Sequence, residues 1–239
     1  MAGGLELSRR LMLAMLERGL PVATELLQPL VAGYFDDLLG WAAIGARTSE
    51  SQVHRELVSG LDLPVGFKNG TGGDIKIAAD AVGAASHPHH FLSVTKQGGT
   101  AIVSTAGNPD CHVILRGGKA PNFDAASVQA ACAVLEKSQL APRLMIDASH
   151  ANSAKKPENQ PAVVDDIAAQ LRAGEQRIVG VMVESHLVAG RQDLVEGQPL
   201  VYGQSITDGC IDWDSSVQVL RALADAVRAR RQQALEQAA

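Results

Sequence analysis

Three observations in the amino-acid sequence predict an α/β fold of the (β/α)₈ TIM-barrel kind. Short apolar runs alternate six times with amphipathic segments, as in a parallel sheet whose strands are joined by helices. The runs have the length of strands and are mainly apolar, which is typical of parallel strands buried on both faces. Each run has a charged or hydrogen-bonding residue at its carboxyl end or directly beside it. The carboxyl ends of barrel strands meet at one face and build the active site there, so this pattern favours a barrel over an open sheet.

The elements follow in a regular order along the chain. A helix is expected over residues 5–18, where Leu5, Met12 and Leu16 recur at helical spacing before Gly19 ends it. Strands are expected where an apolar run is bounded by Gly, Pro or polar residues. The expected strands are 21–26, 42–46, 65–67, 112–115, 144–147 and 178–184. The expected helices between and after them are 30–39, 49–60, 73–86, 123–138, 160–173 and 214–236.

Two intervals interrupt the alternation. Residues 87–110 hold two β-rich runs around Gly98 and Gly99, which predicts an inserted hairpin. Residues 185–213 form a long polar excursion, and such excursions in compact domains usually serve function. Only six strands are counted, whereas a barrel has eight. We therefore expect one domain over residues 1–239, a partial barrel from which the first two βα units are absent.

Composition and charge exclude several classes of protein. The net charge is −5 and the only basic cluster is at 228–231, so nucleic acid and acidic membranes are not expected partners. Cys111, Cys132 and Cys210 have no CxxC spacing and are too few for a disulfide scaffold, which indicates a reducing compartment. Neither a signal peptide nor a membrane-spanning run is found. A soluble cytoplasmic protein is expected.

His150, Glu184 and Asp208 are candidate ligands of a metal ion. Each lies at or after the end of an expected strand, and an imidazole with two carboxylates suits a divalent transition metal. Ser149 and Asn152 are candidates for orienting these ligands through hydrogen bonds. The spacing alone is equally compatible with a structural histidine at 150 and a loop cap at 184, because no compact metal motif is present.

Arg47, Lys68 and Arg116 place three cations at the ends of three expected strands, which favours an anionic ligand. Arginine binds carboxylate or phosphate in a fork, and lysine adds a point charge. The alternative is salt bridging to Glu25 and Glu184, but that would pair only two of the three cations. Glycines after two of these strands would let backbone N–H groups approach phosphate oxygens. They are Gly70, Gly72, Gly73, Gly117 and Gly118.

Several longer motifs together resemble the class I 3-deoxy-D-arabino-heptulosonate 7-phosphate (DAHP) synthases of enteric bacteria. The resemblance covers nearly the whole chain, and several of its blocks are long and specific. The motifs are WAAIGARTSESQVHRELVSGL (41–61), PVGFKNGTGG (64–73), HFLSVTKQGGTAIVSTAGNPDCHVILRGG (90–118), MIDASHANS (145–153), GVMVESHLVAGRQ (180–192) and YGQSITDGCIDW (202–213). The related octulosonate 8-phosphate synthases share the barrel and phosphoenolpyruvate chemistry, but the IGART, GFKNGT and SHANS blocks argue against them.

The resemblance implies a metal-dependent barrel of the class I aldolase-like kind and a set of site residues. His150, Glu184 and Asp208 match three of the family's four metal ligands; manganese, iron, cobalt and zinc are not distinguished. Arg47, Lys68 and Arg116 match residues that bind phosphoenolpyruvate. The backbone of Ala46 and the side chain of Glu25 belong to the same site. His150 and Lys68 would be the catalytic residues, the latter as a proton donor or acceptor near C2 of the substrate.

The implied reaction opens the shikimate pathway toward chorismate and the aromatic amino acids. Phosphoenolpyruvate condenses with erythrose 4-phosphate to give DAHP and phosphate. The hairpin within 87–110 resembles the family's element for feedback inhibition by an aromatic amino acid, and Phe91 and Ser93 match the effector pocket. A homo-oligomer is implied as well.

One departure from the family pattern concerns its first quarter. Family members begin with a strand that carries a Gly-Pro-Cys-Ser motif, whose cysteine is the fourth metal ligand, and a later Lys-Pro-Arg-Thr segment. Neither occurs here, so we expect a chain that corresponds to the last three quarters of a synthase and is poorly folded, oligomeric or inactive alone. The alternative function is a catalytically silent remnant or binding subunit that retains phosphoenolpyruvate or aromatic amino acid binding.

Overall fold

A computed structural model describes residues 2–95 and 97–238. Residue 96 of the predicted hairpin insertion and the two terminal residues of the predicted domain lie outside these ranges. The described residues form two compact units, and the single-domain organisation stays a prediction. The first unit contains the residues up to Gly70, Asp74–Val113 and Lys137–Ala141, and the second contains Thr71–Gly73, Ile114–Glu136 and the residues from Pro142 onward.

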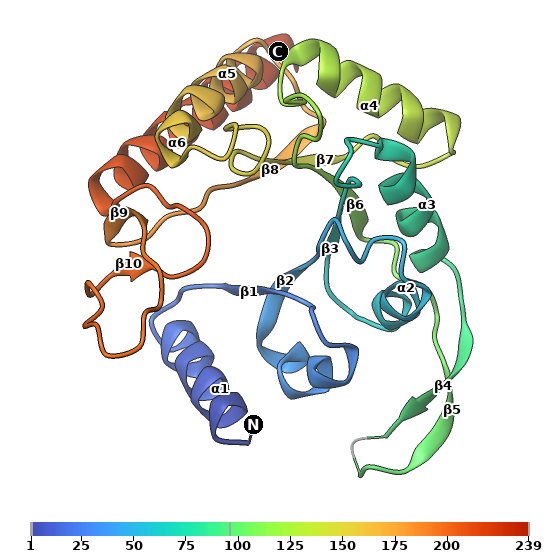
Figure 1. Ribbon diagram of the computed structural model, residues 1–239. Coiled ribbons are helices and arrows are strands. Elements are labelled where there is room, and N and C mark those ends of the chain that lie inside the picture. Colours follow the sequence, from blue (N-terminus) through green and yellow to red (C-terminus); the bar gives the residue numbers. More distant parts are fainter. Residues whose placement is uncertain (1, 96, 239) are drawn as a thin grey trace. The chain divides into compact units, whose positions relative to one another are not determined.

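The first unit is built on parallel strands that hydrogen-bond in the order β1-β2-β3, with β6 next to β3 (Figure 1). Only the first three residues of β6 belong to this unit. The strands are β1 (Val22–Glu25), β2 (Leu39–Ile44), β3 (Val65–Lys68) and β6 (Cys111–Leu115). The α-helices are α1 (Ala2–Leu16), α2 (Gln52–Ser59) and α3 (Ile75–Ala85), and α2 packs against α3.

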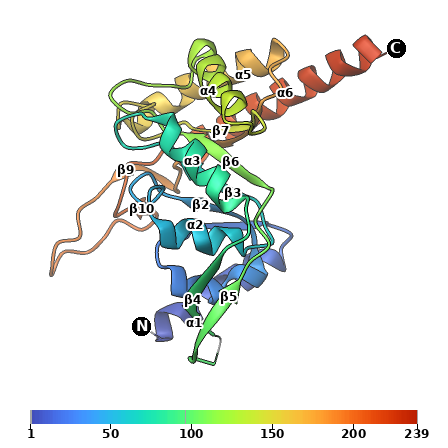
Figure 2. The same cartoon turned by 90° about the vertical axis from the view of Figure 1, so that its right-hand side faces the viewer.

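The second unit continues from the end of β6 through β7 and β8, which pair in parallel. Helices α5 and α6 run side by side in this unit, as both views show (Figures 1 and 2). The strands are β7 (Leu144–Asp147), β8 (Ile178–Met182), β9 (Val188–Arg191) and β10 (Gln204–Ser205). The helices are α4 (Ala125–Lys137), the 3₁₀ helix η3 (Pro157–Asn159), α5 (Gln160–Arg172) and α6 (Trp213–Ala238).

The core of each unit consists of the strands and the apolar helix faces that cover them. All four residues of β3 are buried, as expected of a strand covered on both faces. In the second unit Val128, Cys132 and Leu135 lie on the buried face of α4, so Cys132 is a core residue. Each fully buried Val, Leu or Phe side chain contributes roughly 1.5–3 kcal/mol.

Several predicted element bounds differ from the observed ones; the helix predicted over 5–18 is Ala2–Leu16, and the helix predicted over 49–60 is Gln52–Ser59. The helix predicted over 30–39 is two short 3₁₀ helices, η1 (Pro29–Tyr34) and η2 (Asp36–Leu38). Gly33 lowers helix propensity there, and the side chain of Asp36 bonds the N–H of Asp37 instead of leaving it to an α-helix. Strand β2 starts at Leu39 and ends at Ile44. It ends there because Gly45 begins a turn, in which the Gly45 carbonyl accepts hydrogen bonds from the N–H groups of Thr48 and Ser49. Strand β8 ends two residues before the predicted end.

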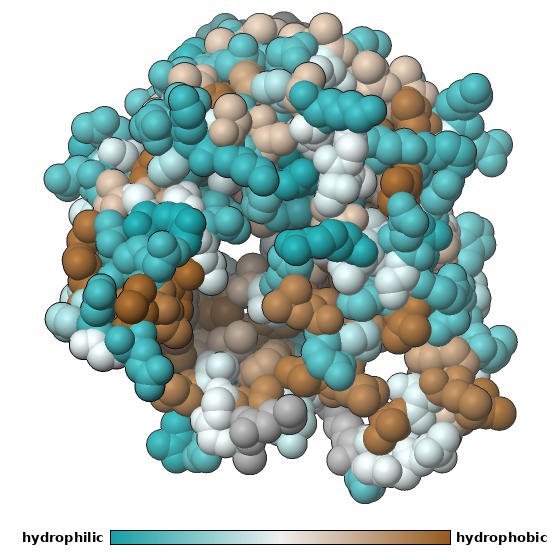
Figure 3. All heavy atoms as spheres, in the orientation of Figure 1, coloured by the Kyte–Doolittle hydropathy of each residue, from teal (hydrophilic) through white to brown (hydrophobic). Residues whose placement is uncertain are grey.

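The predicted hairpin is present in the first unit as β4 (His90–Val94) and β5 (Thr100–Ser104) (Figure 2). Its strands pair antiparallel, with Phe91 opposite Val103 and Ser93 opposite Ala101. The side chains alternate, so Phe91 and Ser93 lie on the less exposed face while Leu92 and Ile102 are each 74% exposed on the other. Brown spheres mark this apolar surface at the lower right of Figure 3.

Candidate functional site

The second unit brings together the three residues predicted to bind a metal ion. One ligand atom from each of His150, Glu184 and Asp208 lies within 4.8 Å of the other two. His150 lies in the turn after β7, and Glu184 comes two residues after the end of β8. Asp208 belongs to the excursion over residues 185–213. These ligands are far apart in the sequence, and parallel strands bring them to one end of the sheet.

The imidazole of His150 is held so that one ring nitrogen faces Glu184. Its Nδ1 lies 2.9 Å from Oδ2 of Asp147, the buried last residue of β7. Its Nε2 lies 3.8 Å from Oε1 of Glu184. A histidine that binds a metal through one nitrogen commonly has a carboxylate at the other, which fixes the ring and its tautomer. The backbone of His150 has φ = +52°, a conformation that residues other than glycine rarely adopt.

The carboxylate of Glu184 is held by its neighbours, and the local charge suits a cation. Ser149 Oγ donates a 2.7 Å hydrogen bond to Oε2 of Glu184. Burial raises the pKa of Glu184; the Ser149 hydroxyl and His150 oppose this rise, whereas Asp208 and Asp147 add to it. Three carboxylates beside one imidazole repel one another, and a divalent cation would relieve that repulsion. The nitrogen and oxygen donors therefore fit a divalent metal ion.

We expected Asn152 to orient the candidate ligands through hydrogen bonds, but its side chain bonds none of their side chains. Its Nδ2 donates to the carbonyls of Leu115 and Asp147, at 3.2 and 2.8 Å. Its Oδ1 accepts from the N–H of Asn122 at 2.8 Å. Because the side chain is short and buried, it reaches backbone groups only. Asn152 thus fixes the ends of β6 and β7 relative to each other.

In the first unit, three strand ends carry predicted phosphoenolpyruvate-binding residues. Lys68 is the last residue of β3 and is only 6% exposed; Ser49 Oγ donates to its carbonyl at 2.7 Å. Ala46 and Arg47 begin the turn after β2, with Arg47 exposed. Glu25 ends β1, and its carboxylate lies against Gly45, where an added Cβ would be 2.3 Å from Oε1. In the second unit, Arg116 directly follows β6 and is half-buried.

Gly117 and Gly118, two of the glycines predicted to approach phosphate, also have a packing role. Gly117 has φ = +74°, and a Cβ there would lie 2.9 Å from the amide nitrogen of Asn152. A Cβ on Gly118 would lie 2.3 Å from the Cα of Gly73. Close backbone contact between loops therefore requires these glycines, whatever ligand the loops bind.

Among the residues that contact the candidate centre, sequence reasoning missed Gln160. Its side chain is fully buried and bonds the backbone of Glu184. A signal was present in the sequence. Gln160 is in register with Val163, Val164 and Ile167, the buried stripe of α5, so it is a polar residue at a core position.

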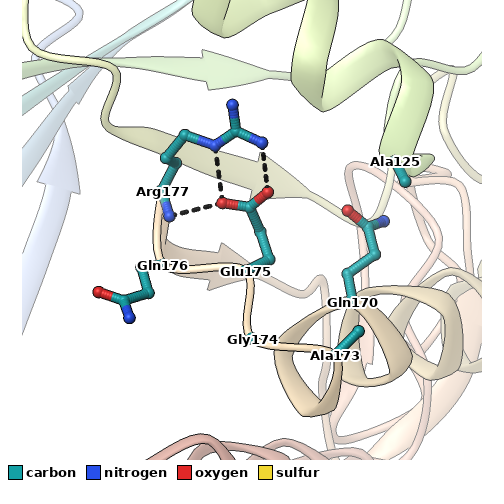
Figure 4. Close-up of a pocket in the computed structure, with 7 residues that line it drawn as sticks. All are labelled: Ala125, Gln170, Ala173, Gly174, Glu175, Gln176 and Arg177. Carbon is teal, nitrogen blue, oxygen red and sulfur yellow. Dashed lines mark hydrogen bonds and ion pairs between the residues drawn. The ribbon is translucent and has the colours of Figure 1, made fainter. Parts of the chain in front are cut away.

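A pocket of the second unit lies away from these residues. It is lined in part by Gln170, Glu175 and Arg177, and Figure 4 shows Arg177 bonded to both carboxylate oxygens of Glu175. None of the predicted site residues lines it. Because its charged groups bond each other, we attribute the ion pair to stability.

The fold and the clustered side chains define an α/β protein with a candidate divalent-metal centre at the carboxyl ends of its strands. The chain belongs to the DAHP synthetase I family, whose model matches residues 2–221. It is 56% identical over 228 residues to "Phospho-2-dehydro-3-deoxyheptonate aldolase, Phe-sensitive" of Escherichia coli K12, covering 95% of this chain and 65% of that protein. A tyrosine-inhibited aldolase of the same name from Schizosaccharomyces pombe is 52% identical, with 96% and 63% covered. The chain thus spans just under two thirds of these relatives' length.

A solved structure confirms the predicted fold class, α/β with the βα units of a (β/α)₈ barrel. The phospho-2-dehydro-3-deoxyheptonate aldolase of Francisella tularensis SCHU S4 matches with a TM-score of 0.92 and 51% identity. The match covers 95% of this chain and 67% of that one. Among the described residues, no helix is both long and apolar enough to cross a membrane.

Proposed function

We propose that this chain serves DAHP synthesis, the metal-dependent condensation of phosphoenolpyruvate with erythrose 4-phosphate, with release of phosphate, in the cytoplasm. One observation carries the proposal: His150, Glu184 and Asp208 converge within 4.8 Å in a member of the DAHP synthetase I family. Relatives that share about half of its residues are named for the corresponding aldolase. As the first step of the shikimate pathway, the reaction would supply aromatic amino acid biosynthesis.

His150, Glu184 and Asp208 would hold the divalent ion. When bound, the ion supplies Lewis acidity toward the carbonyl oxygen of the aldehyde substrate. Asp147 keeps the imidazole in place, and Ser149 holds one oxygen of the Glu184 carboxylate. The donor set accepts manganese, iron, cobalt or zinc.

Arg47, Lys68 and Arg116 would bind phosphoenolpyruvate through its carboxylate and phosphate, with the Ala46 backbone and Glu25 beside them. These roles rest on the matched motifs and on the preference of guanidinium and ammonium groups for such anions. In the reaction, C3 of phosphoenolpyruvate bonds to the aldehyde carbon, water adds at C2 and phosphate leaves. Lys68 would donate or accept the proton near C2.

The hairpin β4–β5 would bind an aromatic amino acid that inhibits the reaction. Phe91 and Ser93 share the less exposed face of the hairpin, as an effector pocket requires. Relatives are named Phe-sensitive and tyrosine-inhibited, which supports an effector of this class. If the hairpin is regulatory, phenylalanine, tyrosine or tryptophan will lower activity in the parent and not in Phe91→Ala. We also propose a homo-oligomer, as the family resemblance implies.

The central test measures phosphate release by the purified chain with both substrates and Mn²⁺. Measurable release would overturn the expectation that this chain is inactive alone. In an active chain, release should require all three components and fall at least 100-fold in His150→Asn. Lys68→Met should lower kcat as well as raise the KM for phosphoenolpyruvate, because a proton-transfer group acts in the transition state. If Lys68→Met kept kcat and raised only KM, the proton-transfer role would be wrong.

Two other outcomes would contradict the proposal. Phosphate release without a divalent ion would exclude the metal-dependent reaction. A chain that binds Mn²⁺ and phosphoenolpyruvate by calorimetry but forms no product under any condition would be a binding subunit instead.

A further inference from the structure

Gln160 is a polar side chain in the interior of the second unit. It is the first residue of α5 and is 0% exposed. The positions that follow it on the same helix face are apolar and buried, namely Val163, Val164 and Ile167. Burying a carboxamide costs free energy unless its donor and acceptor are both satisfied. The partners of Gln160 therefore indicate why it is there.

Both partners belong to the backbone of Glu184. Gln160 Oε1 accepts from the N–H of Glu184 at 2.8 Å, and Gln160 Nε2 donates to its carbonyl at 3.0 Å. Glu184 lies beyond the end of β8, so pairing with β7 no longer reaches its backbone groups. The carboxamide presents one donor and one acceptor, as the backbone of a neighbouring strand would. Gln160 thus replaces a neighbouring strand as the hydrogen-bond partner of the Glu184 backbone.

The same carbonyl also fixes the return of the excursion over residues 185–213. The N–H of Ile211 donates to the Glu184 carbonyl at 3.0 Å, and the Ile211 carbonyl accepts from His186 at 2.9 Å. Asp208 lies three residues before Ile211. The Glu184 carbonyl is therefore shared between Gln160 and the segment that carries the third candidate ligand.

The start of α5 is itself tied to the turn that carries His150. Asn159 Nδ2 donates to the carbonyl of Ser153 at 3.0 Å, three residues after His150. Next to it, Pro157 packs against Gly209, where an added Cβ would lie 3.1 Å from Cγ of the proline. Helix η3 and the first residue of α5 thus together contact all three segments that carry candidate ligands.

We propose that Gln160 is a positioning residue that sets the backbone of Glu184 so that its carboxylate is preorganised for a divalent ion. This inference rests on the proposed function. Ser149 holds one carboxylate oxygen of Glu184. That bond alone does not fix the orientation of the carboxylate, because the backbone of Glu184 must be held in place as well. Removing hydrogen-bond partners of metal ligands typically lowers metal affinity 10- to 100-fold. We expect an effect of this size from Gln160, although it bonds the ligand's backbone.

The test measures Co²⁺ binding to the full chain by calorimetry and by the visible absorption of the bound ion. Gln160→Met keeps the length of the side chain and removes both hydrogen bonds. Gln170→Met is the matched control, because Gln170 is on the same helix and its Nε2 bonds Phe123 and Asp166 instead. We expect at least 10-fold weaker Co²⁺ binding in Gln160→Met and less than a 2-fold change in Gln170→Met.

A general loss of stability is separated from positioning by the spectrum at saturating Co²⁺. Gln160→Met should shift the absorption band, because the geometry around the ion changes, while Gln170→Met should leave the band unchanged. Glu184→Gln reports whether the ion occupies the predicted centre. If Glu184→Gln weakens binding and Gln160→Met alters neither affinity nor spectrum, the inference is overturned and the proposed function stands. If Glu184→Gln also leaves binding unchanged, the proposed metal centre and the inference both fail.

Discussion

The conformation of His150 is costly in isolation, which makes it informative. Its φ of +52° falls in the left-handed region, where residues other than glycine cost about 1–2 kcal/mol. Such strain persists only where the surroundings hold it, and it concentrates at functional sites. Asp147 supplies part of that restraint, with its carboxylate 2.9 Å from the ring. The strained turn points the remaining nitrogen toward Glu184, as a ligand role requires.

Replacing His150 by asparagine should separate the strain from the chemistry. Asparagine tolerates the left-handed conformation better than most residues, so His150→Asn should shift the free energy of unfolding by about 1 kcal/mol or less. Mn²⁺ binding should nevertheless fall at least 100-fold, because a ligand nitrogen is lost. Urea unfolding and calorimetry measure the two quantities. His150→Val should destabilise more, since a β-branched residue is disfavoured at positive φ; an equal effect of both variants would contradict the strain argument.

At the residue scale, the sequence predicted the residues of the candidate metal centre better than it predicted the residues that hold them in place. His150 and Glu184 could be found because each follows an apolar run. Gln160 and Asp147 act through contacts that depend on where β7, β8 and α5 lie in space. No spacing rule in the chain encodes a glutamine that bonds a residue 24 positions away.

Among the structural elements, the hairpin β4–β5 is anchored at its base by close backbone contact. The N–H of Gly107 donates to the carbonyl of Ser59 at 3.0 Å, and Asn108 N donates to Ala85 O at 2.9 Å. Gly107 has φ = +87°, and an added Cβ would lie 2.3 Å from the carbonyl oxygen of Ser86. Backbone atoms cannot move aside as a flexible side chain can. This glycine is therefore required by both conformation and space.

Gly107→Ala should destabilise the chain by about 3 kcal/mol or more, because strain at positive φ adds to a backbone clash. Gly98→Ala is the matched control: Gly98 also has positive φ, +83°, but nothing lies within 4 Å of an added Cβ. It should cost about 1 kcal/mol. Urea denaturation at neutral pH measures both. Similar losses of stability in the two variants would show that the backbone at the base of the hairpin can move aside and that the contact with Ser86 does not determine the cost.

The ion pair before β8 predicts a pH dependence of stability. Arg177 donates to both carboxylate oxygens of Glu175, at 2.8 and 2.6 Å, and this holds the pKa of Glu175 below its ordinary value of 4.5. A lowered folded-state pKa stabilises the fold above the unfolded value, and this stabilisation is lost as the pH falls through the folded pKa. The side chain of Glu175 is 16% exposed, so the pair is only partly screened by water.

Glu175→Gln should therefore cost roughly 1 kcal/mol at pH 7, since an amide accepts hydrogen bonds but carries no charge. The difference from the parent should shrink as the pH falls below 4.5. The exposed pair Asp225–Arg228 supplies the control, and Asp225→Asn should change stability by less than about 0.5 kcal/mol at either pH. A constant difference between parent and Glu175→Gln from pH 7 to pH 3 would contradict the ionic origin.

The elements that could be predicted are those whose local signal agrees with their packing. β7 was predicted at its observed bounds, because Pro142 and Ala148-Ser149 flank a run that is both apolar and strand-length. The two 3₁₀ helices after Pro29 could not be predicted, because the apolar residues there recur at helical spacing while Gly33 and Asp36 favour tighter turns. Periodicity reports which face is buried, and it does not distinguish an α-helix from successive 3₁₀ turns.

For the whole molecule, the fold class could be predicted from the alternation of apolar runs and amphipathic segments. The grouping of residues into two compact units could not be predicted in this way. The unit boundary falls inside β6, between Val113 and Ile114, where the sequence is a continuous apolar run. His150, Glu184 and Asp208 all belong to the second unit, whereas Arg47 and Lys68 belong to the first. Arg116, the third predicted anion-binding residue, belongs to the second unit. The candidate metal ligands can therefore be assigned by experiment separately from Arg47 and Lys68, but not from Arg116.

Amide hydrogen exchange should show this separation. A ligand at 100 times its Kd stabilises the conformation that binds it by about 2.7 kcal/mol. Co²⁺ alone should slow exchange in the second unit, most around 147–153, 182–186 and 208–211, and His150→Asn should abolish the effect. Phosphoenolpyruvate alone should slow exchange in the turn after β2 and at the end of β3, and Lys68→Met should weaken it. Uniform protection of both units by Co²⁺ would show that they open as one cooperative body. Protection of neither unit by saturating Co²⁺ would contradict a preformed metal centre.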